Sequence, residues 1–344
     1  IDNVIHLHNG KKTLQSNSKK KRDVLNVQNN LEKQSEEEEE YEKFCSQFSI
    51  LVFDNAASGR SYTPVGFTTP KMMARDAWEL VLGPQVGWHK VHIVGQSMGG
   101  LIAQEMVQLF NERDQTEQNR RLFSIGDTRE EGTNNVIHRE NGVGGGGSEE
   151  NGTGRSDKSE VVVSIESVSL FNTFVSFYHV PFGLPMWSCL KFVMLSPFKR
   201  SRSSIMRHVL NQMFSAQCLE TQFATLEQKF RILFHPLTVN PVGSVKQLVG
   251  MALHFKTAAQ FVSQFQRLNR PVLIVCSSGD MMVSHRNSLE MYRLLTESNP
   301  SFPVTLELVD GAGHIVNAEA FERINELLYR RWFVQSTAVA PQPL

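Results

Sequence analysis

A serine framed by glycines lies where a predicted strand passes directly into a predicted helix. Residues 91–107 read VHIVGQSMGGLIAQEMV, and residues 95–99 match the pattern G-x-S-x-G with Ser97 at the centre. The apolar run Val91–Val94 predicts a buried strand, and the residues from Leu101 onward predict a helix. So tight a turn predicts a strained serine backbone, and we expect the two glycines to remove side chains that would collide. The alternative is a glycine-rich turn that binds phosphate or only packs.

Short apolar runs and helical patterns alternate along much of the chain. Six runs predict buried parallel strands: Val4–His8, Ile50–Phe53, Val91–Val94, Ser167–Phe171, Val272–Cys276 and Val304–Val309. Three helical patterns accompany them: Lys71–Leu82, Met98–Leu109 and Glu319–Trp332. Pro70 suits the start of the first helix, and Met72, Ala77, Leu80 and Val81 are predicted to lie near one face of it. This alternation predicts an α/β fold, with an open, mostly parallel sheet and helices on both faces.

Composition divides the chain into a core, two polar stretches and one helical region. Residues 10–40 and 111–159 are polar, lack apolar periodicity and are predicted to be disordered insertions. Residues 175–265 contain helical patterns and many aromatic side chains, and we expect them to form an inserted helical cap or lid. A second helical layer of the core is the alternative. The α/β core is then predicted to comprise residues 1–9, 41–110, 160–174 and 266–335.

Charge and cysteine content narrow the classes of partner. The 344-residue chain has 35 Lys+Arg and 35 Asp+Glu, so its net charge is zero and no basic excess favours nucleic acid. The four cysteines contain no C-x-x-C pair, which disfavours zinc or a disulfide framework and weakly favours a cytoplasmic location. His6 and His8 share a strand face but no third ligand is placed near them, so we expect no metal. No apolar run of about 18 residues predicts a transmembrane helix, and contact with a membrane surface stays open.

A serine nucleophile needs a base within hydrogen-bond reach and an acid that orients the base. His314 follows a predicted strand in a glycine-rich loop, at the carboxyl edge of the sheet where Ser97 also lies. Asp280 ends the preceding strand unit and can reach across to this histidine. Asp310 is four residues from the histidine in the same loop, and Asp54 precedes the serine, against the order Ser, Asp, His. Ser97, Asp280 and His314 are therefore the predicted nucleophile, acid and base.

These residues resemble the α/β-hydrolase superfamily, in particular its lid-bearing esterase and lipase branch. Phe48–Met106 and Pro271–Trp332, roughly a third of the chain, carry the likeness. The resemblance implies the same nucleophile, acid and base, and no cofactor. The backbone N–H of Met98, at the start of the predicted helix, is one expected donor to an oxyanion. The resemblance implies the N–H of Gly10 as the second donor.

The sequence departs from the superfamily pattern at three places. Residues 54–61 read DNAASGRS, without the usual Arg-Gly pair after the aspartate. Residues 8–10 read HNG where His-Gly is usual, and the polar insertion follows at once. Only three residues precede Val4, where two further strands are usual, and the chain starts with Ile1 rather than Met. We therefore expect a fragment in which the first strands are missing.

The predicted activity is hydrolysis of a small-molecule carboxylic ester through an acyl-enzyme. The aromatic-rich cap favours a lipophilic, lipid-like substrate. Serine at position 97 disfavours epoxide hydrolase and haloalkane dehalogenase, which use aspartate there. Thioesterase, carbon–carbon bond hydrolase and cofactor-free perhydrolase activities stay open. Two functions outside the enzymes also stay open. One is a hydrolase-fold ligand-binding protein or receptor without turnover, and the other is a scaffold that acts through the polar insertions.

Overall fold

The computed structural model describes residues 48–127, 163–176, 202–233 and 241–334. The predicted strand Val4–His8 and the insertion predicted over residues 10–40 lie outside them. The chain divides into two units, Ile1–Val52 and Phe53–Leu344. In the first unit only residues 48–52 are described, and they form neither a helix nor a strand.

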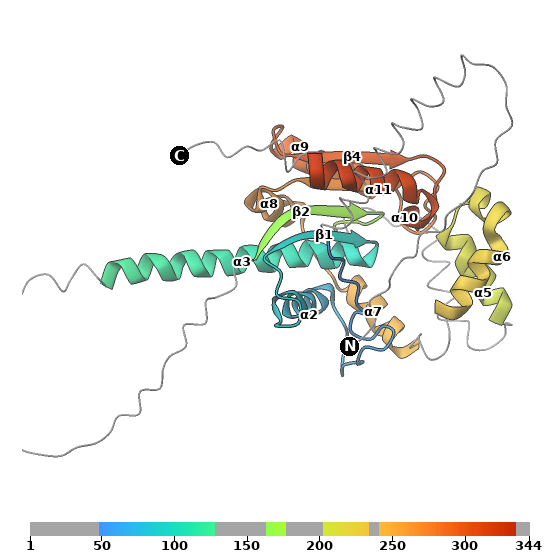
Figure 1. The fold of residues 1–344 in the computed structure, drawn as a ribbon, viewed down its shortest axis with the longest axis horizontal. Helices are drawn as coiled ribbons and strands as arrows, with labels where there is room; N and C mark the ends of the chain where they lie inside the picture. Colours follow the sequence, from blue (N-terminus) through green and yellow to red (C-terminus); the bar gives the residue numbers. More distant parts are fainter. Residues whose placement is uncertain (1–47, 128–162, 177–201, 234–240, 335–344) are drawn as a thin grey trace, which may run out of the picture. The chain divides into compact units, whose positions relative to one another are not determined.

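Four parallel strands form the sheet of the second unit (Figure 1). In chain order they are β1 (Lys90–Gln96), β2 (Ser164–Phe171), β3 (Val272–Ser277) and β4 (Val304–Val309). Their order in the sheet is the same, and each strand pairs in parallel with the next. This confirms the predicted parallel sheet. Because the strands are parallel, the segments that follow their last residues all begin at one edge, the carboxyl edge.

The strand predicted over residues 50–53 is absent, so that prediction was wrong. Ile50 is 84 % exposed and Val52 is 81 % exposed. A strand needs a hydrogen-bonded neighbour, and none pairs with this segment in the part of the chain that the structure describes. An apolar run alone does not distinguish a strand from extended coil.

Helix α2 (Pro70–Leu82) begins where its sequence predicts. The Thr69 side chain caps the helix by accepting a hydrogen bond from the Met72 N–H, with an N···O distance of 3.3 Å. Pro70 occupies the first turn, where its missing N–H would have no helical partner in any case.

The buried face of α2 differs from the predicted one. It consists of Pro70, Met73, Ala74, Ala77, Trp78 and Val81. Of the four residues predicted to share a face, Met72 and Leu80 are 37 % and 38 % exposed, so that face is not the buried one. Trp78 accounts for the rotation, because its indole N–H donates to the Met106 carbonyl at 3.0 Å. That bond turns the largest side chain of α2 towards helix α3 (Met98–Asp127).

Helix α3 is longer than the sequence predicted. It begins directly after Ser97, as expected, but continues past Leu109 into the polar stretch predicted as an insertion. Glu, Gln and Arg are frequent there, and all three are good helix formers. Polar composition therefore did not end the helix. Residues 128–159 of the predicted insertion lie outside the described residues.

The structure describes four helices between β2 and β3. They are α5 (Arg202–Met213), α6 (Ala216–Leu233), α7 (Pro241–Ala252) and α8 (Ala258–Leu268). Helices α5 and α6 share a small apolar cluster made by Met206, Leu210, Phe214 and Leu226. Helix α8 instead contacts α3 and α9 (Arg286–Ser298) and so belongs with the helices that flank the sheet. The role of the remaining helices as a cap stays a prediction.

Helices flank the sheet on both faces, as predicted (Figure 1). Helix α9 contacts β3 and β4. Leu273 and Val275 of β3 instead pack in one cluster with Ile324 of α11 (Phe321–Tyr329). Successive residues of a strand point to opposite faces, so the two sets of contacts cover both sides of the sheet.

The last predicted helix, Glu319–Trp332, is divided in the structure. It comprises α10 (Val316–Glu319), α11 and the π-helical segment η2 (Arg330–Val334). The break falls at Ala320, whose φ of −120° and ψ of 42° are not helical. The break separates the segment that holds the predicted histidine from the helix that packs on the sheet.

Candidate active site

Ser97 occupies a strained turn between β1 and α3. Its φ angle is +54°, in the left-handed region that residues other than glycine rarely adopt, which confirms the expected strain. The Ser97 N–H donates to the Phe171 carbonyl at 2.9 Å. The Ser97 carbonyl accepts from the Gly100 N–H at 3.0 Å and from the Thr173 hydroxyl at 2.7 Å. The end of β2 therefore holds the serine in this conformation.

At only one of the two glycines of the motif would a side chain collide with its surroundings. A Cβ on Gly95 would lie 2.3 Å from the Gly99 carbonyl oxygen, as the collision argument predicts. A Cβ on Gly99 would meet nothing within 4 Å, so the prediction was wrong for that residue. Gly100 is the second constrained position, because a Cβ there would lie 2.5 Å from the side chain of Thr173.

The structure joins the predicted acid to the predicted histidine. Asp280 Oδ2 lies 2.8 Å from His314 Nδ1, and the two side chains are 0 % and 3 % exposed. The other carboxylate oxygen, Oδ1, accepts from the N–H groups of Met282 (2.7 Å) and Val283 (2.9 Å). Both oxygens of Asp280 are thus held in place. A neutral ring that donates its Nδ1–H to this carboxylate keeps Nε2 as an acceptor.

The two other candidate aspartates are engaged in their own turns. Asp310 Oδ1 accepts from the Ser278 hydroxyl at 2.6 Å, and that hydroxyl accepts from the Gly311 N–H at 2.8 Å. Asp54 Oδ2 accepts from the Arg60 N–H at 3.0 Å. Neither carboxylate has a hydrogen bond to a histidine among the described residues. The geometry therefore favours Asp280.

Two amides that sequence reasoning missed bring the histidine loop to the serine turn. Gln96 Nε2, next to Ser97, donates to the His314 carbonyl at 2.7 Å. Asn172 Nδ2 donates to the same carbonyl at 2.8 Å and to the Gly313 carbonyl at 3.2 Å. One signal could have identified Asn172, since it directly follows a predicted strand at the carboxyl edge and asparagine tolerates a positive φ.

The serine and the histidine are linked through backbone rather than through their side chains. Among the described residues, the Ser97 hydroxyl makes no hydrogen bond to the His314 ring. Such bonds are often long in free enzymes and shorten when substrate binds. Met98 is the first residue of α3, where N–H groups have no partner within the helix. Gly10, the other predicted oxyanion donor, lies outside the described residues.

The cysteine nearest the acid is not a competing nucleophile. Cys276 lies in β3, four residues before Asp280, and is fully buried. Burial raises the pKa of its thiol to about 11, so the thiolate is disfavoured at neutral pH. Cys276 is therefore a poor nucleophile at this edge.

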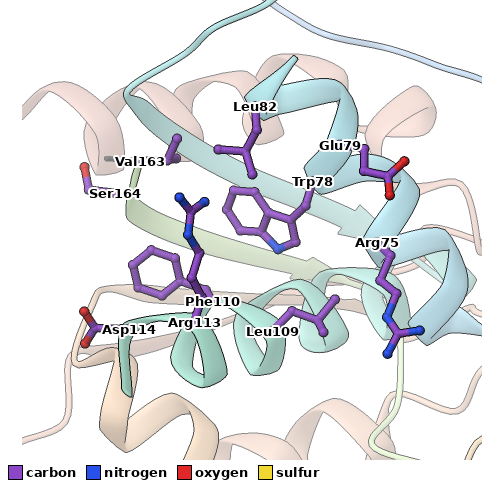
Figure 2. Close-up of a pocket in the computed structure, with 10 residues that line it drawn as sticks. All are labelled: Arg75, Trp78, Glu79, Leu82, Leu109, Phe110, Arg113, Asp114, Val163 and Ser164. Atoms are coloured by element: carbon purple, nitrogen blue, oxygen red, sulfur yellow. The ribbon is translucent and has the colours of Figure 1, made fainter. Parts of the chain in front are cut away.

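A cavity of about 430 Å³ lies apart from this site (Figure 2). Its wall includes Trp78 and Leu82 of α2 and Phe110 of α3. Ser164, the first residue of β2, also lines it, which places it at the amino edge of the sheet. Ser97 lies at the opposite edge, so this cavity is not the pocket next to the serine.

The described residues contain neither a candidate metal site nor a candidate membrane span. No three His, Cys, Asp or Glu side chains converge there in a way that could hold a metal ion. Of the helices in the same residues, none is long and apolar enough to cross a membrane.

Comparison with known proteins defines the class of fold. A family model described as alpha/beta hydrolase fold matches residues 22–115, which include the serine turn. The chain is similar to a thermophilic esterase from Thermogutta terrifontis solved with malate bound, at a TM-score of 0.54 and 16 % identity, covering 86 % of this chain and 82 % of that one. It is also similar to MGS-M2, an alpha/beta hydrolase enzyme from a Medee basin deep-sea metagenome library, at a TM-score of 0.53 and 12 % identity, covering 85 % and 83 %. No curated protein matches the chain.

A parallel sheet with flanking helices and a strained serine between strand and helix define the α/β-hydrolase fold. The chain has the α/β-hydrolase fold. At these identities the solved structures show the fold and not the substrate.

Proposed function

We propose that this chain is a serine hydrolase of carboxylic esters that works through an acyl-enzyme. The observation that carries the proposal is the 2.8 Å contact between Asp280 and His314, at the edge where the strained Ser97 directly precedes α3. The likeness to an esterase fold supports the reaction class.

In the proposed mechanism, His314 Nε2 takes the hydroxyl proton of Ser97 as Oγ attacks the ester carbonyl carbon. Asp280 orients the ring and stabilises the imidazolium, and the N–H group of Met98 donates to the oxyanion. The imidazolium gives its proton to the leaving alcohol oxygen as the C–O bond breaks, which leaves an acyl-serine. Water then attacks the acyl carbon and its proton passes to the histidine. The carboxylic acid departs, and the proton returns to the serine oxygen.

A lipophilic acyl or alcohol group is part of the proposal. Leu101, one turn after the serine, packs in a buried cluster with Phe174 and Val283. Met251 of α7 and Met282 pack against this cluster. An apolar cluster thus lies one turn from the serine, and methionine side chains adapt readily to ligands of different shape. An ester panel of graded acyl length that includes a thioester separates this substrate class from thioesterase activity.

Labelling with a fluorophosphonate probe tests the proposal. We expect the wild-type protein to be labelled and Ser97→Ala to be unlabelled, because only an activated serine reacts with the probe. Ser301→Ala removes an exposed serine before β4 and serves as the matched control with wild-type labelling. Absence of labelling in folded wild-type protein would overturn the proposal.

A ligand-binding protein without turnover is the second candidate. The missing hydrogen bond between the Ser97 hydroxyl and the His314 ring favours it. The same experiment separates the two candidates, since a binding protein would show no labelling yet would be stabilised by apolar esters in thermal unfolding.

A further inference from the structure

The loop that carries His314 is tied to helix α6 by a single carboxylate. Oε1 of Glu319, the last residue of α10, accepts from the backbone N–H groups of Gly313 and Ser215, both at 2.9 Å. Oε2 accepts from the Ser215 hydroxyl at 2.5 Å. That hydroxyl also accepts from the Cys218 N–H at 3.2 Å, in the first turn of α6. Glu319 therefore joins the peptide next to the histidine to the start of α6.

Packing strengthens the same junction. The Ile315 N–H donates to the Met213 carbonyl at 3.1 Å, and Ile315 packs against the apolar cluster of α5 and α6. A Cβ on Gly313 would lie 2.6 Å from Glu319 Oε1 and 2.7 Å from the Phe214 backbone carbon. Neither side of the junction can therefore move far without the other.

The same stretch of backbone is held from the sheet as well. Gln96 and Asn172 donate to the His314 carbonyl, and Asn172 also donates to the Gly313 carbonyl. Glu319 is the group that holds the N–H side of Gly313. The backbone around the histidine is thus fixed from two directions, by the sheet and by α6.

We propose that Glu319 is a positioning residue for His314 and that, through Ser215, it makes the position of the histidine depend on α5 and α6. The inference rests on the proposed function, in which His314 is the base. Among the described residues, Glu319 contacts neither the histidine ring nor Ser97, so it acts through the Gly313 backbone. A displacement of about 1 Å in a catalytic group can cost about 100-fold in rate.

Two substitutions of Glu319 are expected to affect kcat differently. Glu319→Ala removes all three accepted hydrogen bonds, and we expect kcat to fall about 10- to 100-fold. Glu319→Gln keeps one oxygen for the two N–H groups and turns its NH₂ group to the Ser215 hydroxyl, so kcat should stay within about 3-fold of wild type. Glu322→Gln, an exposed carboxylate on α11, is the matched control and should behave as wild type.

Ser215→Ala tests the tie to α6 separately. It removes the hydroxyl from Oε2 but leaves Oε1 on the Gly313 N–H, so we expect KM to change more than kcat. Because Glu319 and Ser215 act as one unit, Ser215→Ala should have little further effect in the Glu319→Ala background.

Ester kinetics and the proton NMR spectrum of nitrogen-15 histidine-labelled protein decide the inference together. The downfield Nδ1–H resonance of His314, assigned by its loss in His314→Gln, reports the Asp280 contact without turnover. We expect this resonance to shift or broaden in Glu319→Ala and to stay in place in Glu319→Gln and Glu322→Gln. An unchanged resonance with an unchanged kcat in folded Glu319→Ala would overturn the inference.

Failure of the proposed function is a separate outcome. If the wild-type protein is not labelled by fluorophosphonate, the esterase proposal falls, while the NMR comparison still shows whether Glu319 positions the loop. Should Glu319→Ala fail to fold, Glu319→Asp takes its place, because its carboxylate is one methylene shorter and cannot reach Gly313 and Ser215 together.

Discussion

At Asn172 a single buried side chain connects two loops and a strand end at the carboxyl edge. Its Nδ2 donates to the Ser277 hydroxyl at 2.9 Å and to the His314 carbonyl at 2.8 Å. Its Oδ1 accepts from the Ser277 N–H at 3.0 Å. The φ angle of Asn172 is +44°, so both its backbone and its amide are needed at this position.

Replacement of this side chain should be costly for stability. We expect Asn172→Ala to lower the free energy of unfolding by about 2–4 kcal/mol, because buried polar partners lose their hydrogen bonds and alanine disfavours a positive φ. Asn269, at the end of α8, has a similar φ of +46° but is exposed. Asn269→Ala should therefore cost only about 1 kcal/mol. An equal loss of unfolding free energy in Asn172→Ala and Asn269→Ala, measured by urea denaturation, would contradict the role assigned to the Asn172 amide.

At the scale of elements, the loop between α7 and α8 is fastened to α3 by a buried ion pair. Lys256 Nζ lies 2.7 Å from Glu105 Oε1, and both side chains are buried. The ammonium also donates to Gln264 Oε1 at 2.7 Å. In the same loop, burial lowers the pKa of His254 to about 4. Its Nε2 has no hydrogen-bond partner, so the ring is buried in its neutral form.

This histidine predicts a loss of stability in acid. The unfolded chain binds a proton on His254 below about pH 6.5, whereas the folded chain does so only near pH 4. Stability should therefore fall as the pH decreases through this window, by about 2 kcal/mol between pH 7 and pH 5. Urea denaturation of wild type and His254→Gln at both pH values checks this. The difference should vanish in that variant and persist in His89→Gln, which changes an exposed histidine.

Elements defined by local patterns were predictable from the sequence, and contacts between distant elements were not. The strand, serine turn and helix around Ser97 follow from adjacent residues, and the order of parallel strands places Asp280 and His314 at one edge. Asn172 was missed because its partners lie more than 100 residues away along the chain, and Glu319 because its partner Ser215 lies 104 residues away. The place of Asn172 directly after a predicted strand was the one local signal, and Glu319 had no such signal.

At the scale of the whole molecule, the amino and carboxyl edges of the sheet carry different kinds of residue. Arg331 of η2 is buried and donates to the carbonyls of Val272 (2.8 Å) and Pro303 (2.9 Å), at the amino ends of β3 and β4. It also donates to the Thr305 hydroxyl at 2.7 Å. Burial lowers its pKa to about 10, so it remains charged at neutral pH. The last described segment of the chain thus covers the amino ends of β3 and β4, whereas the carboxyl edge holds the candidate site.

Removal of the Arg331 hydrogen bonds at the amino edge should lower stability without changing the reaction with fluorophosphonate. We expect Arg331→Met to lower the free energy of unfolding by about 2–4 kcal/mol, because two buried carbonyls lose a charged donor. The rate of fluorophosphonate labelling per folded molecule should stay at the wild-type value. Arg330→Met, at the exposed neighbouring position, is the control for stability. A slower labelling rate in folded Arg331→Met would show that the two edges are coupled.

The positive φ angle of Ser97 lowers stability at the residue that we propose as the nucleophile. Glycine adopts this conformation without strain, so Ser97→Gly should raise the free energy of unfolding by about 1 kcal/mol, and Ser97→Ala should not. Chemical denaturation of the two variants checks this difference. In a lineage released from catalysis, substitutions at this position would therefore drift towards glycine. The residue at position 97 would then distinguish homologues that keep the proposed activity from homologues that have lost it.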